Sequence, residues 1–218
     1  MTFRLIHILA EGKTEQIFIE KSLRPHFRNL GTDLAITLAR PGRSAEATGG
    51  VRIYEAIRSD VIGMLSERGS PFVTTMIDYY GRPTNMPGND SLPDGTPRDK
   101  AIYLESKWGD DIGYSQRFVP HYALHEFEAL MFCDPEAIAS ATPGIDNMAG
   151  LREIAESVET PEDINDSPET APSKRLEKFL RYKKALHGPL IAQKIGLPII
   201  RAKCPHFNEW LTKLEGLR

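Results

Sequence analysis

The chain has 218 residues and a formal net charge of −3, with 40% hydrophobic and 26% charged residues. These values are typical of a globular protein large enough for one sizeable α/β domain. No apolar run has the length that a membrane span needs, and the first residues enter a strand-like pattern rather than a secretory signal, so we expect a cytoplasmic protein. Cys133 and Cys204 show neither a metal-ligand spacing nor a disulfide framework, which fits a reducing compartment.

The first half of the chain alternates apolar strands with amphipathic helices. Apolar runs predict strands at 5–9, 34–39 and 72–77. Helical periodicity predicts helices at 14–30 and 51–68. The strand at 72–77 is apolar at almost every position, as a central strand covered on both faces should be.

The second half continues this alternation after a long loop at 79–98 that is rich in proline and glycine. The later elements are predicted as a helix at about 98–108, a strand at 118–124, helices from Glu126 and from Pro135, a helix at 173–186, a shorter helix after Pro189, a strand at 198–202 and a last helix from Pro205. Four or five strands alternating with helices indicate an α/β fold with a mostly parallel, Rossmann-like sheet flanked by helices.

Charge is unevenly distributed along the chain. Residues 1–124 carry 15 acidic and 15 basic residues, whereas residues 125–172 carry 12 acids against Arg152 alone. Residues 173–218 carry 11 Lys and Arg against three acids. Such a basic segment can bind a polyanion or an acidic partner, or it can pack beside the acidic middle of the same protein. Charge alone leaves both interpretations open.

Acidic side chains stand where two of the predicted strands end. Glu11 follows the first strand, Asp78 follows the strand at 72–77, and Glu15 lies four residues after Glu11 at the start of a helix. Parallel strands end at the same sheet edge, so the three carboxylates should meet there. They would repel one another unless a divalent cation joined them, and oxygen ligands favour Mg²⁺ or Mn²⁺. Each acid alone is more simply explained by a helix dipole or a turn, but the three together favour a metal site.

The segment around Lys13 resembles the end of a nucleotide-binding phosphate loop. That motif requires a glycine five residues before its Gly-Lys pair, and His7 stands at this position. We therefore reject a phosphate loop, although Lys13 could contact a phosphate as a point charge.

A second cluster follows the strand at 118–124. His125 and Glu126 should begin at the same sheet edge as Asp78, which makes Glu126 a candidate metal ligand and His125 a candidate acid, base or phosphate contact. Glu128 should point elsewhere if the segment is helical. The alternative is that His125 merely caps the junction between strand and helix.

A third, basic cluster begins the helix at 173–186. Lys174 and Arg175 at a helix N-terminus can hold an anionic oxygen, and Lys174 could steady charge that develops during a reaction. Arg175, Lys178 and Arg201 could extend this cluster into a track for a nucleic-acid backbone. A solvated basic face is the commoner meaning of such a run.

Several motifs carry a resemblance to a known clan. They are Glu11-Gly12-Lys13-Thr14-Glu15, Met76-Ile77-Asp78-Tyr79-Tyr80-Gly81, His125-Glu126-Phe127-Glu128-Ala129-Leu130, Pro172-Ser173-Lys174-Arg175-Leu176 and the segment from Arg201 to Leu211. Together they resemble the Toprim fold of topoisomerases, primases and OLD-type nucleases, and more closely one uncharacterised family within that clan. The resemblance implies a single Toprim-like domain over 1–218, with a core of about 1–135 and 196–218 and a helical appendage of about 136–195.

The resemblance also implies roles for the acidic residues. Glu11 matches the Toprim catalytic glutamate, Glu15 matches the acid one turn later in nucleolytic members, and Asp78 matches the first acid of an Asp-x-Asp pair. Tyr80 replaces the second acid of that pair, so a complete two-metal centre requires that an acid of the second cluster compensates.

We therefore expect a Mg²⁺- or Mn²⁺-dependent phosphodiester-cleaving enzyme, a nuclease acting on DNA or RNA. The resemblance implies a partner ATPase and a part in phage defence, because such proteins are often encoded beside predicted ATPases. One alternative is a catalytically weak Toprim-like subunit that docks on a partner ATPase or on nucleic acid. Another is an enzyme that hydrolyses a nucleotide or a small phosphate ester.

Overall fold

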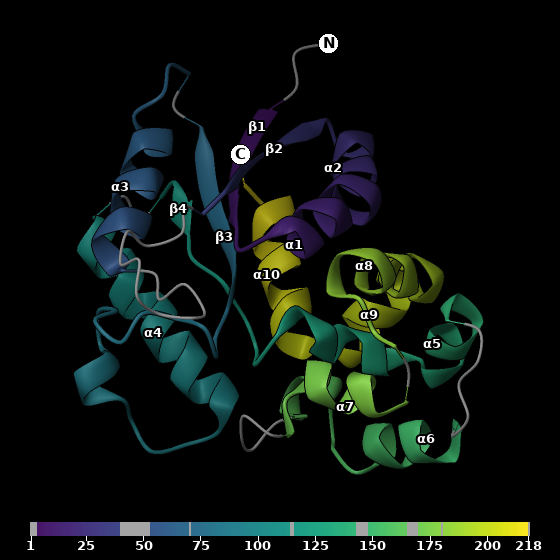
Figure 1. Ribbon diagram of the computed structural model, residues 1–218. Helices are drawn as coiled ribbons and strands as arrows, with labels where there is room; N and C mark the ends of the chain where they lie inside the picture. Colours follow the sequence, from purple (N-terminus) through teal and green to yellow (C-terminus); the bar gives the residue numbers. More distant parts are fainter. Residues whose placement is uncertain are drawn as a thin grey trace.

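A parallel five-stranded sheet forms the centre of the protein (Figure 1). The computed structural model describes residues 4–39, 53–69, 71–113, 116–142, 148–164, 170–179 and 181–217. The strands are β1 (Arg4–Ala10), β2 (Thr32–Leu38), β3 (Phe72–Asp78), β4 (Phe118–Val119) and β5 (Tyr122–Ala123). Their order is β2-β1-β3-β4, β5 also pairs with β3, and every pairing is parallel. The expected α/β fold with a mostly parallel sheet is confirmed.

The register of the central strands brings two chain segments together at the carboxyl edge. Ala10 of β1 lies opposite Met76 of β3, and the Glu11 backbone N–H donates a 2.9 Å hydrogen bond to the Met76 carbonyl oxygen. On the other side of β3, Asp78 lies opposite Ala123 of β5. The ends of three strands therefore meet at one place.

Helices of the first half follow the predicted order with small shifts of their ends. The helix expected at 14–30 is a continuous helical stretch with a π-helical middle, formed by α1 (Lys13–Phe18), η1 (Ile19–Leu23) and α2 (Arg24–Asn29). Gly31 follows it with a φ of +76°, a conformation that glycine adopts without strain. The next helices are α3 (Tyr54–Leu65) and α4 (Pro97–Ile112), and the first two residues of the helix expected at 51–68 lie outside the described residues. A short 3₁₀ turn, η2 (Asn89–Ser91), lies in the long loop before α4.

The second half is more helical than the sequence pattern predicts. It contains η3 (Phe127–Cys133), α5 (Pro135–Ala141), α6 (Met148–Glu156), η4 (Pro161–Asp163), α7 (Pro172–Phe179), α8 (Lys184–Ile195), α9 (Leu197–Lys203) and α10 (Pro205–Glu215). In the described ranges, no helix combines the length and the apolar character that crossing a membrane would require.

Several predicted elements differ from the structure. The strand expected at 118–124 forms two short strands, β4 and β5, with residues 120–121 between them. The helix expected from Glu126 is the 3₁₀ helix η3, which begins at Phe127. The strand expected at 198–202 is wrong, because this segment forms α9: proline near the first turn favours a helix, and Ile200 is buried while Ile199 stays exposed. The helix expected at 173–186 ends at Phe179, and residues 181–183 are not helical. The helix expected after Pro189 starts earlier, with Pro189 inside α8.

Both faces of the sheet are covered, as its apolar central strands require. Ile6 and Ile8 point into a core shared with α1, α2, α8 and α10. Leu9, Val73 and Ile77 point into a second core shared with α3 and α4. Figure 1 shows α3 and α4 on one side of the sheet and α1, α2 and α10 on the other. The proposed division into a core and a helical appendage stays a prediction.

Cys133 and Cys204 are buried free thiols whose Sγ atoms lie 3.3 Å apart. They join the end of η3 to the junction between α9 and α10. The hydrogen bond with Cys133, followed by desolvation, raises the pKa of the Cys204 thiol well above its usual range, so Cys204 serves as a packing group.

Candidate functional site

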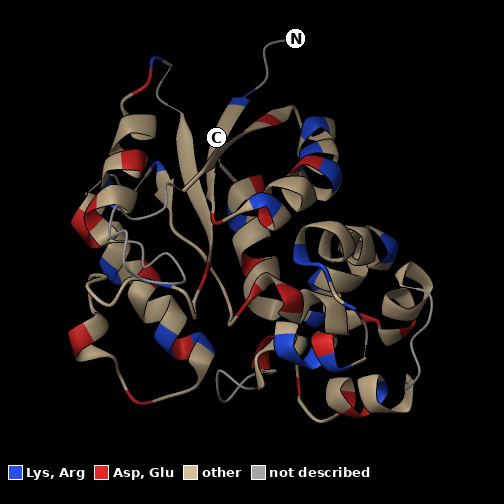
Figure 2. Ribbon diagram, in the orientation of Figure 1, with Lys and Arg blue, Asp and Glu red and all other residues tan. Residues whose placement is uncertain are grey.

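Four acidic side chains converge at the carboxyl edge of the sheet. They are Glu11 after β1, Glu15 in the first turn of α1, Asp78 at the end of β3 and Glu128 in η3, and we call them the acidic cluster. Figure 2 shows acidic residues at the lower ends of the central strands. The sequence predicts that the first three meet here. The prediction that Glu128 points elsewhere is wrong, because Glu128 lies close enough to repel Asp78 and Glu15.

Hydrogen bonds from the backbone hold three of these carboxylates. Glu11 Oε2 accepts a 2.7 Å hydrogen bond from the Asp78 N–H, and Asp78 Oδ1 accepts one of 3.0 Å from the Phe127 N–H. Glu15 Oε2 accepts a 2.8 Å hydrogen bond from the Gly12 N–H at the start of α1. Glu11 thereby ties β1 to β3 and Asp78 ties β3 to η3, whereas the Glu15 bond caps the start of α1.

The acidic cluster is electrostatically unfavourable when all its members are ionised. Burial, followed by repulsion from Glu11, Glu15 and Glu128, raises the pKa of Asp78 well above its usual range. Burial and repulsion from Glu11 and Glu128 likewise raise the pKa of Glu15 to about 7, against hydrogen bonds that lower it. Burial also raises the pKa of Glu128. A proton or a cation is needed to relieve this repulsion.

Lys184, at the start of α8, supplies a positive charge to this region. Its Nζ lies 3.2 Å from Glu128 Oε2 and 3.6 Å from Glu126 Oε1. Burial lowers the pKa of Lys184, but the attraction of Glu128 and Glu126 outweighs it and raises the pKa above its usual range. Tyr182 Oη donates a 3.0 Å hydrogen bond to Glu128 Oε1 on the other side of the same carboxylate.

Gly188 allows α8 to lie close enough for these contacts. A Cβ atom at this position would stand 2.8 Å from Tyr182 Oη, 3.2 Å from Thr14 Cγ2 and 3.3 Å from the Phe127 ring. A side chain at this position would displace the Tyr182 hydroxyl and crowd α1 and η3, whereas glycine permits the close approach. The glycine therefore positions Lys184 and Tyr182 beside the acidic cluster.

Replacing Lys184 with methionine should lower the free energy of unfolding by about 1 kcal/mol at low salt, because Glu126 and Glu128 lose their counter-charge. The loss should shrink at high salt, since the Lys184 side chain is 47% exposed. Urea denaturation at two salt concentrations measures both values. Lys174→Met is the matched control: it breaks only an exposed pair with Glu177 and should cost less than about 0.5 kcal/mol. Equal losses for the two variants would contradict the assigned role of Lys184.

Glu126, the predicted further metal ligand, lies next to the acidic cluster rather than within it. Its Oε2 accepts a 3.0 Å hydrogen bond from the Ser173 N–H at the start of α7. Glu126 is extended, with φ −146° and ψ 157°, and η3 begins only after it. The anion site expected at the N-terminus of α7 is thus filled by a carboxylate of the protein itself, and metal ligation by Glu126 stays a prediction.

His125 has an unusual backbone at the edge of the site. It is buried and has a φ of +62°, in the left-handed region that costs a residue with a side chain on the order of 1 kcal/mol or more. Its carbonyl oxygen accepts a 3.2 Å hydrogen bond from the Tyr80 N–H, which fixes the loop after β3. Strained positions of this kind are typical of functional sites.

Two of the predicted phosphate contacts are engaged in local interactions. Lys13 is exposed, and its Nζ donates a 3.0 Å hydrogen bond to Gln16 Oε1. Arg201 donates to Asn208 Oδ1 at 2.7 Å and to Glu215 Oε2 at 3.1 Å, so it joins α9 to α10. A role for Arg201 in phosphate binding requires that these bonds break.

The remaining predicted cations lie on α7. Lys174 is exposed and pairs with Glu177 at 2.8 Å, and Arg175 Nε donates to the Thr170 carbonyl oxygen at 2.7 Å. Lys178 is exposed one turn after Lys174. Their roles in catalysis or nucleic-acid binding stay predictions.

The carboxylates suit a hard divalent cation in their chemistry. Mg²⁺ takes oxygen ligands, of which one or two are carboxylates and several are waters. Among the described residues, the one set of three acidic, histidine or cysteine ligand atoms that all lie within 4.8 Å of one another belongs to Glu105, His121 and His206. Three members of the acidic cluster would have to move closer to bind one ion together, whereas one or two can do so with water.

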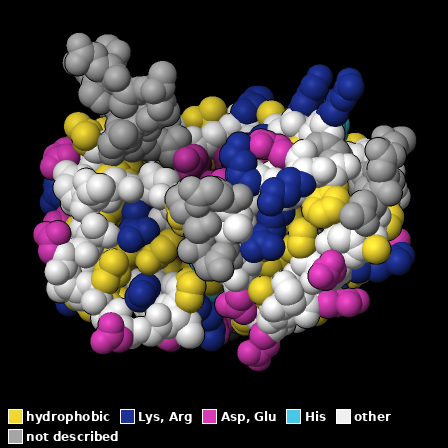
Figure 3. Space-filling model, turned by 60° about the horizontal axis from the view of Figure 1, so that its bottom comes forward, with side chains coloured by type: hydrophobic (Ala, Val, Ile, Leu, Met, Phe, Trp, Pro, Cys, Tyr) yellow, Lys and Arg dark blue, Asp and Glu magenta, His cyan; other side chains and the backbone are white. Residues whose placement is uncertain are grey.

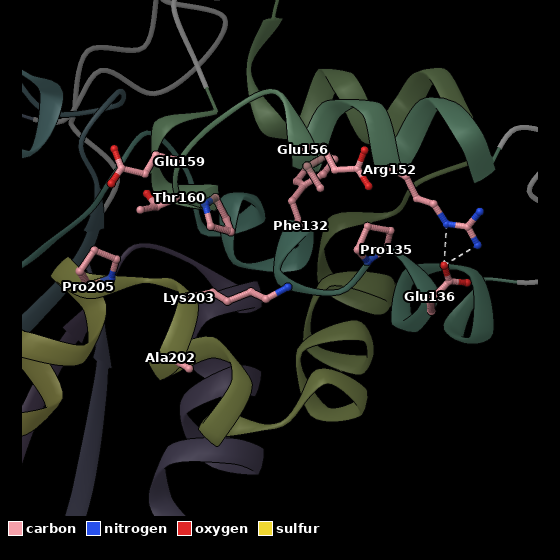
Figure 4. A pocket seen from close by; sticks show the side chains of 12 residues that line it. Phe132, Pro135, Glu136, Arg152, Glu156, Glu159, Thr160, Ala202, Lys203 and Pro205 are labelled. Carbon is pink, nitrogen blue, oxygen red and sulfur yellow. Dashed lines mark hydrogen bonds and ion pairs between the residues drawn. The ribbon is translucent and has the colours of Figure 1, made fainter.

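A pocket of about 620 Å³ lies on other elements (Figure 4). It is lined by residues of η3, α5, α6, η4, α9 and α10 and of the turn before η4, and by none of the acidic cluster. Both basic side chains in its lining are engaged: Arg152 Nε donates to Glu136 Oε1 at 2.8 Å, and Lys203 Nζ donates to the Cys133 carbonyl oxygen at 2.8 Å. The pocket therefore offers no unengaged positive charge to an anionic ligand among these residues.

The chain belongs to the family described as "Domain of unknown function (DUF4276)", whose model matches residues 10–215. No curated protein matches the chain at a significant level. The C-terminal region of the OLD protein of Burkholderia pseudomallei is similar in structure, with 18% identity, a TM-score of 0.43 and coverage of 99% of this chain and 100% of that one. The corresponding region of the Xanthomonas campestris pv. campestris OLD protein has 14% identity and a TM-score of 0.41, over 97% of this chain and 96% of that one. These likenesses are too distant to transfer a site residue by residue.

Proposed function

We propose that this member of the DUF4276 family is a Mg²⁺- or Mn²⁺-dependent phosphodiester hydrolase that cleaves nucleic acid. The acidic cluster is the observation that carries the proposal. Carboxylates from β1, α1, β3 and η3 share one sheet edge, and they raise the pKa values of Asp78 and Glu15 by repulsion in addition to burial. Such an arrangement opposes folding, so its presence supports a role in binding a cation.

Each side chain has a part in this proposal. Glu11 and Asp78 would hold the cation, with Glu15 assisting and Glu126 as a further ligand. When bound, a divalent cation polarises a phosphate oxygen and lowers the pKa of a water molecule. His125 and Lys174 would steady the negative charge that develops on the phosphate. Lys184 Nζ lies 3.2 Å from Glu128 Oε2, and its charge opposes the rise in the pKa of Glu128 that burial causes.

A basic surface beside the acidic cluster supports a polyanionic substrate. Figure 3 views the face toward which the strands' carboxyl ends point, and Lys and Arg side chains gather near its centre. Exposed basic residues on α7 and before and at the start of α8 are Lys174, Lys178, Arg181, Lys183 and Lys184. Cations of this kind attract a phosphate backbone without reading its sequence, so both DNA and RNA are candidate substrates. The partner ATPase and the part in phage defence follow from the resemblance of the motifs and stay predictions.

Metal-dependent cleavage of single- and double-stranded DNA and RNA tests the proposal. We expect cleavage with Mn²⁺ or Mg²⁺, none with excess chelator, and a loss of more than about tenfold in Glu11→Gln. Glu153→Gln, which changes an exposed acid on α6, should cleave at the wild-type rate. Two results together would contradict the proposal: the wild type leaves all four polymers intact, and Glu11→Gln binds Mn²⁺ with the same affinity as the wild type.

A binding subunit is the second candidate, and the hydrogen bonds of the cluster favour it. Glu11, Glu15 and Asp78 each already accept a backbone N–H, so Glu11 and Asp78 can act as structural ties between elements and Glu15 as a helix cap. In this case, nucleic acid should bind equally well to the wild type and to Glu11→Gln, with or without a divalent cation, and no cleavage should occur. Turnover of free nucleotides without polymer cleavage would instead indicate a small-molecule enzyme.

A further inference from the structure

A second group of potential ligands lies on elements that do not contribute to the acidic cluster. Glu105 comes from α4, His121 from the segment between β4 and β5, and His206 from the first turn of α10. All three side chains are buried. Each offers one ligand atom, and these three atoms all lie within 4.8 Å of one another.

The distances within this group fit coordination of one small ion. Glu105 Oε1 lies 2.9 Å from His206 Nε2 and 3.5 Å from His121 Nδ1. In a tetrahedral zinc site with bonds of about 2.0–2.1 Å, neighbouring ligand atoms are about 3.3 Å apart. The two measured separations lie on either side of that value. The third separation, between the two imidazole nitrogens, is at most 4.8 Å. The two rings are stacked, with centroids 4.9 Å apart and planes 27° apart, so at least one imidazole must rotate to direct its lone pair at a shared ion.

A simple ion pair does not account for the second imidazole. Glu105 and His206 alone would form a hydrogen-bonded pair, and Glu105 Oε1 also accepts a 2.9 Å hydrogen bond from the Tyr122 N–H. In the described part of the chain, the buried His121 Nδ1 has no hydrogen-bond partner, although it faces the same oxygen. A buried nitrogen without a partner is costly, and a bound cation would satisfy it.

Neighbouring side chains hold the three ligands in place. The His121 ring stacks on Trp210 at a centroid distance of 4.3 Å and an interplanar angle of 5°. Glu162 accepts hydrogen bonds from the His206 and Phe207 N–H groups, both at 2.9 Å, and so fixes the start of α10. Such supporting contacts orient ligands before the metal arrives.

The group is accessible from the surface. All three residues line a pocket of about 110 Å³ that also contains Lys213 and Glu209. This volume is large enough for a cation and a water molecule as a fourth ligand. The pocket provides the entry path that a metal site requires.

We propose that Glu105, His121 and His206 form a site for a divalent transition metal, with Zn²⁺ as the best fit. Two imidazoles and one carboxylate favour Zn²⁺ and its neighbours over Mg²⁺, whereas the acidic cluster offers oxygen alone. The protein thus carries two separate sites with different metal preferences. The transition-metal site does not depend on the proposed hydrolase activity.

Cobalt binding to the untagged, chelator-treated full chain tests this site. One equivalent of Co²⁺ per chain should bind and produce visible d–d absorption. Adding Zn²⁺ should displace the bound Co²⁺ and remove this absorption. Glu105→Gln and His206→Asn should each weaken Co²⁺ binding by more than about tenfold, with folding confirmed by circular dichroism. His187→Asn is the histidine control, because His187 lies on α8 away from this group.

The acidic-cluster variants distinguish this proposal from the proposed function. Glu11→Gln and Asp78→Asn should retain the cobalt spectrum even if they abolish all cleavage. The proposal is overturned if the wild type shows no such absorption, if folded Glu105→Gln and His206→Asn retain it, or if Asp78→Asn removes it. A failure of nucleic-acid cleavage with an intact cobalt site would affect only the proposed function.

Discussion

Replacing Asp78 with asparagine is expected to abolish nucleic-acid cleavage while making the metal-free protein more stable. Asparagine retains the size of the side chain and an oxygen that can accept the Phe127 N–H. It removes the Asp78 carboxyl group, whose pKa is raised well above its usual range by burial and by repulsion from Glu11, Glu15 and Glu128. Cleavage should fall by more than about 100-fold in Mn²⁺, because a candidate metal ligand is lost. Initial rates and the Tm in EDTA at pH 8 measure the two effects.

Asp33→Asn provides a control of opposite electrostatic sign. Hydrogen bonds from Arg24 and Arg28 lower the pKa of Asp33, so its charge stabilises the fold. Its replacement should lower the Tm and leave cleavage unchanged. The assignment of Asp78 is contradicted if Asp78→Asn lowers the Tm as Asp33→Asn does and still cleaves nucleic acid.

The Asp78→Asn variant also distinguishes the two candidate functions. If the protein is a hydrolase, the charge repulsion at Asp78 lowers its stability but serves its activity. Asp78→Asn should then be more stable than the wild type and should not cleave nucleic acid. In a binding subunit, the repulsion has no catalytic use, and Asp78→Asn should gain stability without losing partner or nucleic-acid binding. Measuring stability and activity on one variant therefore tests more than either measurement does alone.

The sheet could be predicted where apolar runs coincide with central strands. β1, β2 and β3 lie within a few residues of their predicted positions, because strands buried on both faces are apolar throughout. The segment 198–202 is also mostly apolar, with Arg201 as its one charged residue, yet it forms part of α9. A run of this length fits a buried strand and a helix equally well, so periodicity could not decide between them.

The acidic cluster could be predicted only in part. Glu11 and Asp78 follow neighbouring parallel strands, and this topology alone brings them to one edge. Glu128 joins them because the chain stays extended through Glu126 before η3 begins. Lys184 lies beside the acidic cluster because α8 packs on α1, and this packing depends on the close approach at Gly188. No short-range pattern in the sequence predicts such a contact.

The three residues of the proposed transition-metal site could not be predicted for the same reason. Glu105, His121 and His206 are far apart in the sequence and have no motif spacing. They meet because α4 and α10 pack beside the segment between β4 and β5, where Glu105 Oε1 approaches both imidazoles. Only the tertiary structure shows that these three residues are neighbours.

Replacing Glu15 with glutamine should stabilise the metal-free protein increasingly as the pH rises. Burial, with repulsion from Glu11 and Glu128, raises the pKa of Glu15 from 4.5 to about 7 in the folded protein. Below pH 4.5 both states hold the proton, and the wild type has no penalty. Between pH 4.5 and pH 7, Glu15 is ionised in the unfolded chain but still protonated in the folded protein, so the stability of the wild type falls as the pH rises. Above pH 7, Glu15 is ionised in both states, and its burial lowers the free energy of unfolding by about 3 kcal/mol.

Glutamine does not ionise and can still accept the Gly12 N–H, so Glu15→Gln isolates this effect. The difference in unfolding free energy between variant and wild type should grow from near zero at pH 4 to about 3 kcal/mol at pH 8, as measured by urea denaturation in EDTA. Glu215→Gln is a control of opposite sign. Burial raises the pKa of Glu215, but hydrogen bonds from Arg201 and His26 outweigh it and lower the pKa. The wild type therefore gains stability as the pH rises, and the stability of Glu215→Gln relative to the wild type should fall. A pH-independent difference for Glu15→Gln would contradict the raised pKa. If the acidic cluster holds a cation, adding Mn²⁺ at pH 8 should stabilise the wild type more than the variant and so narrow the difference between them.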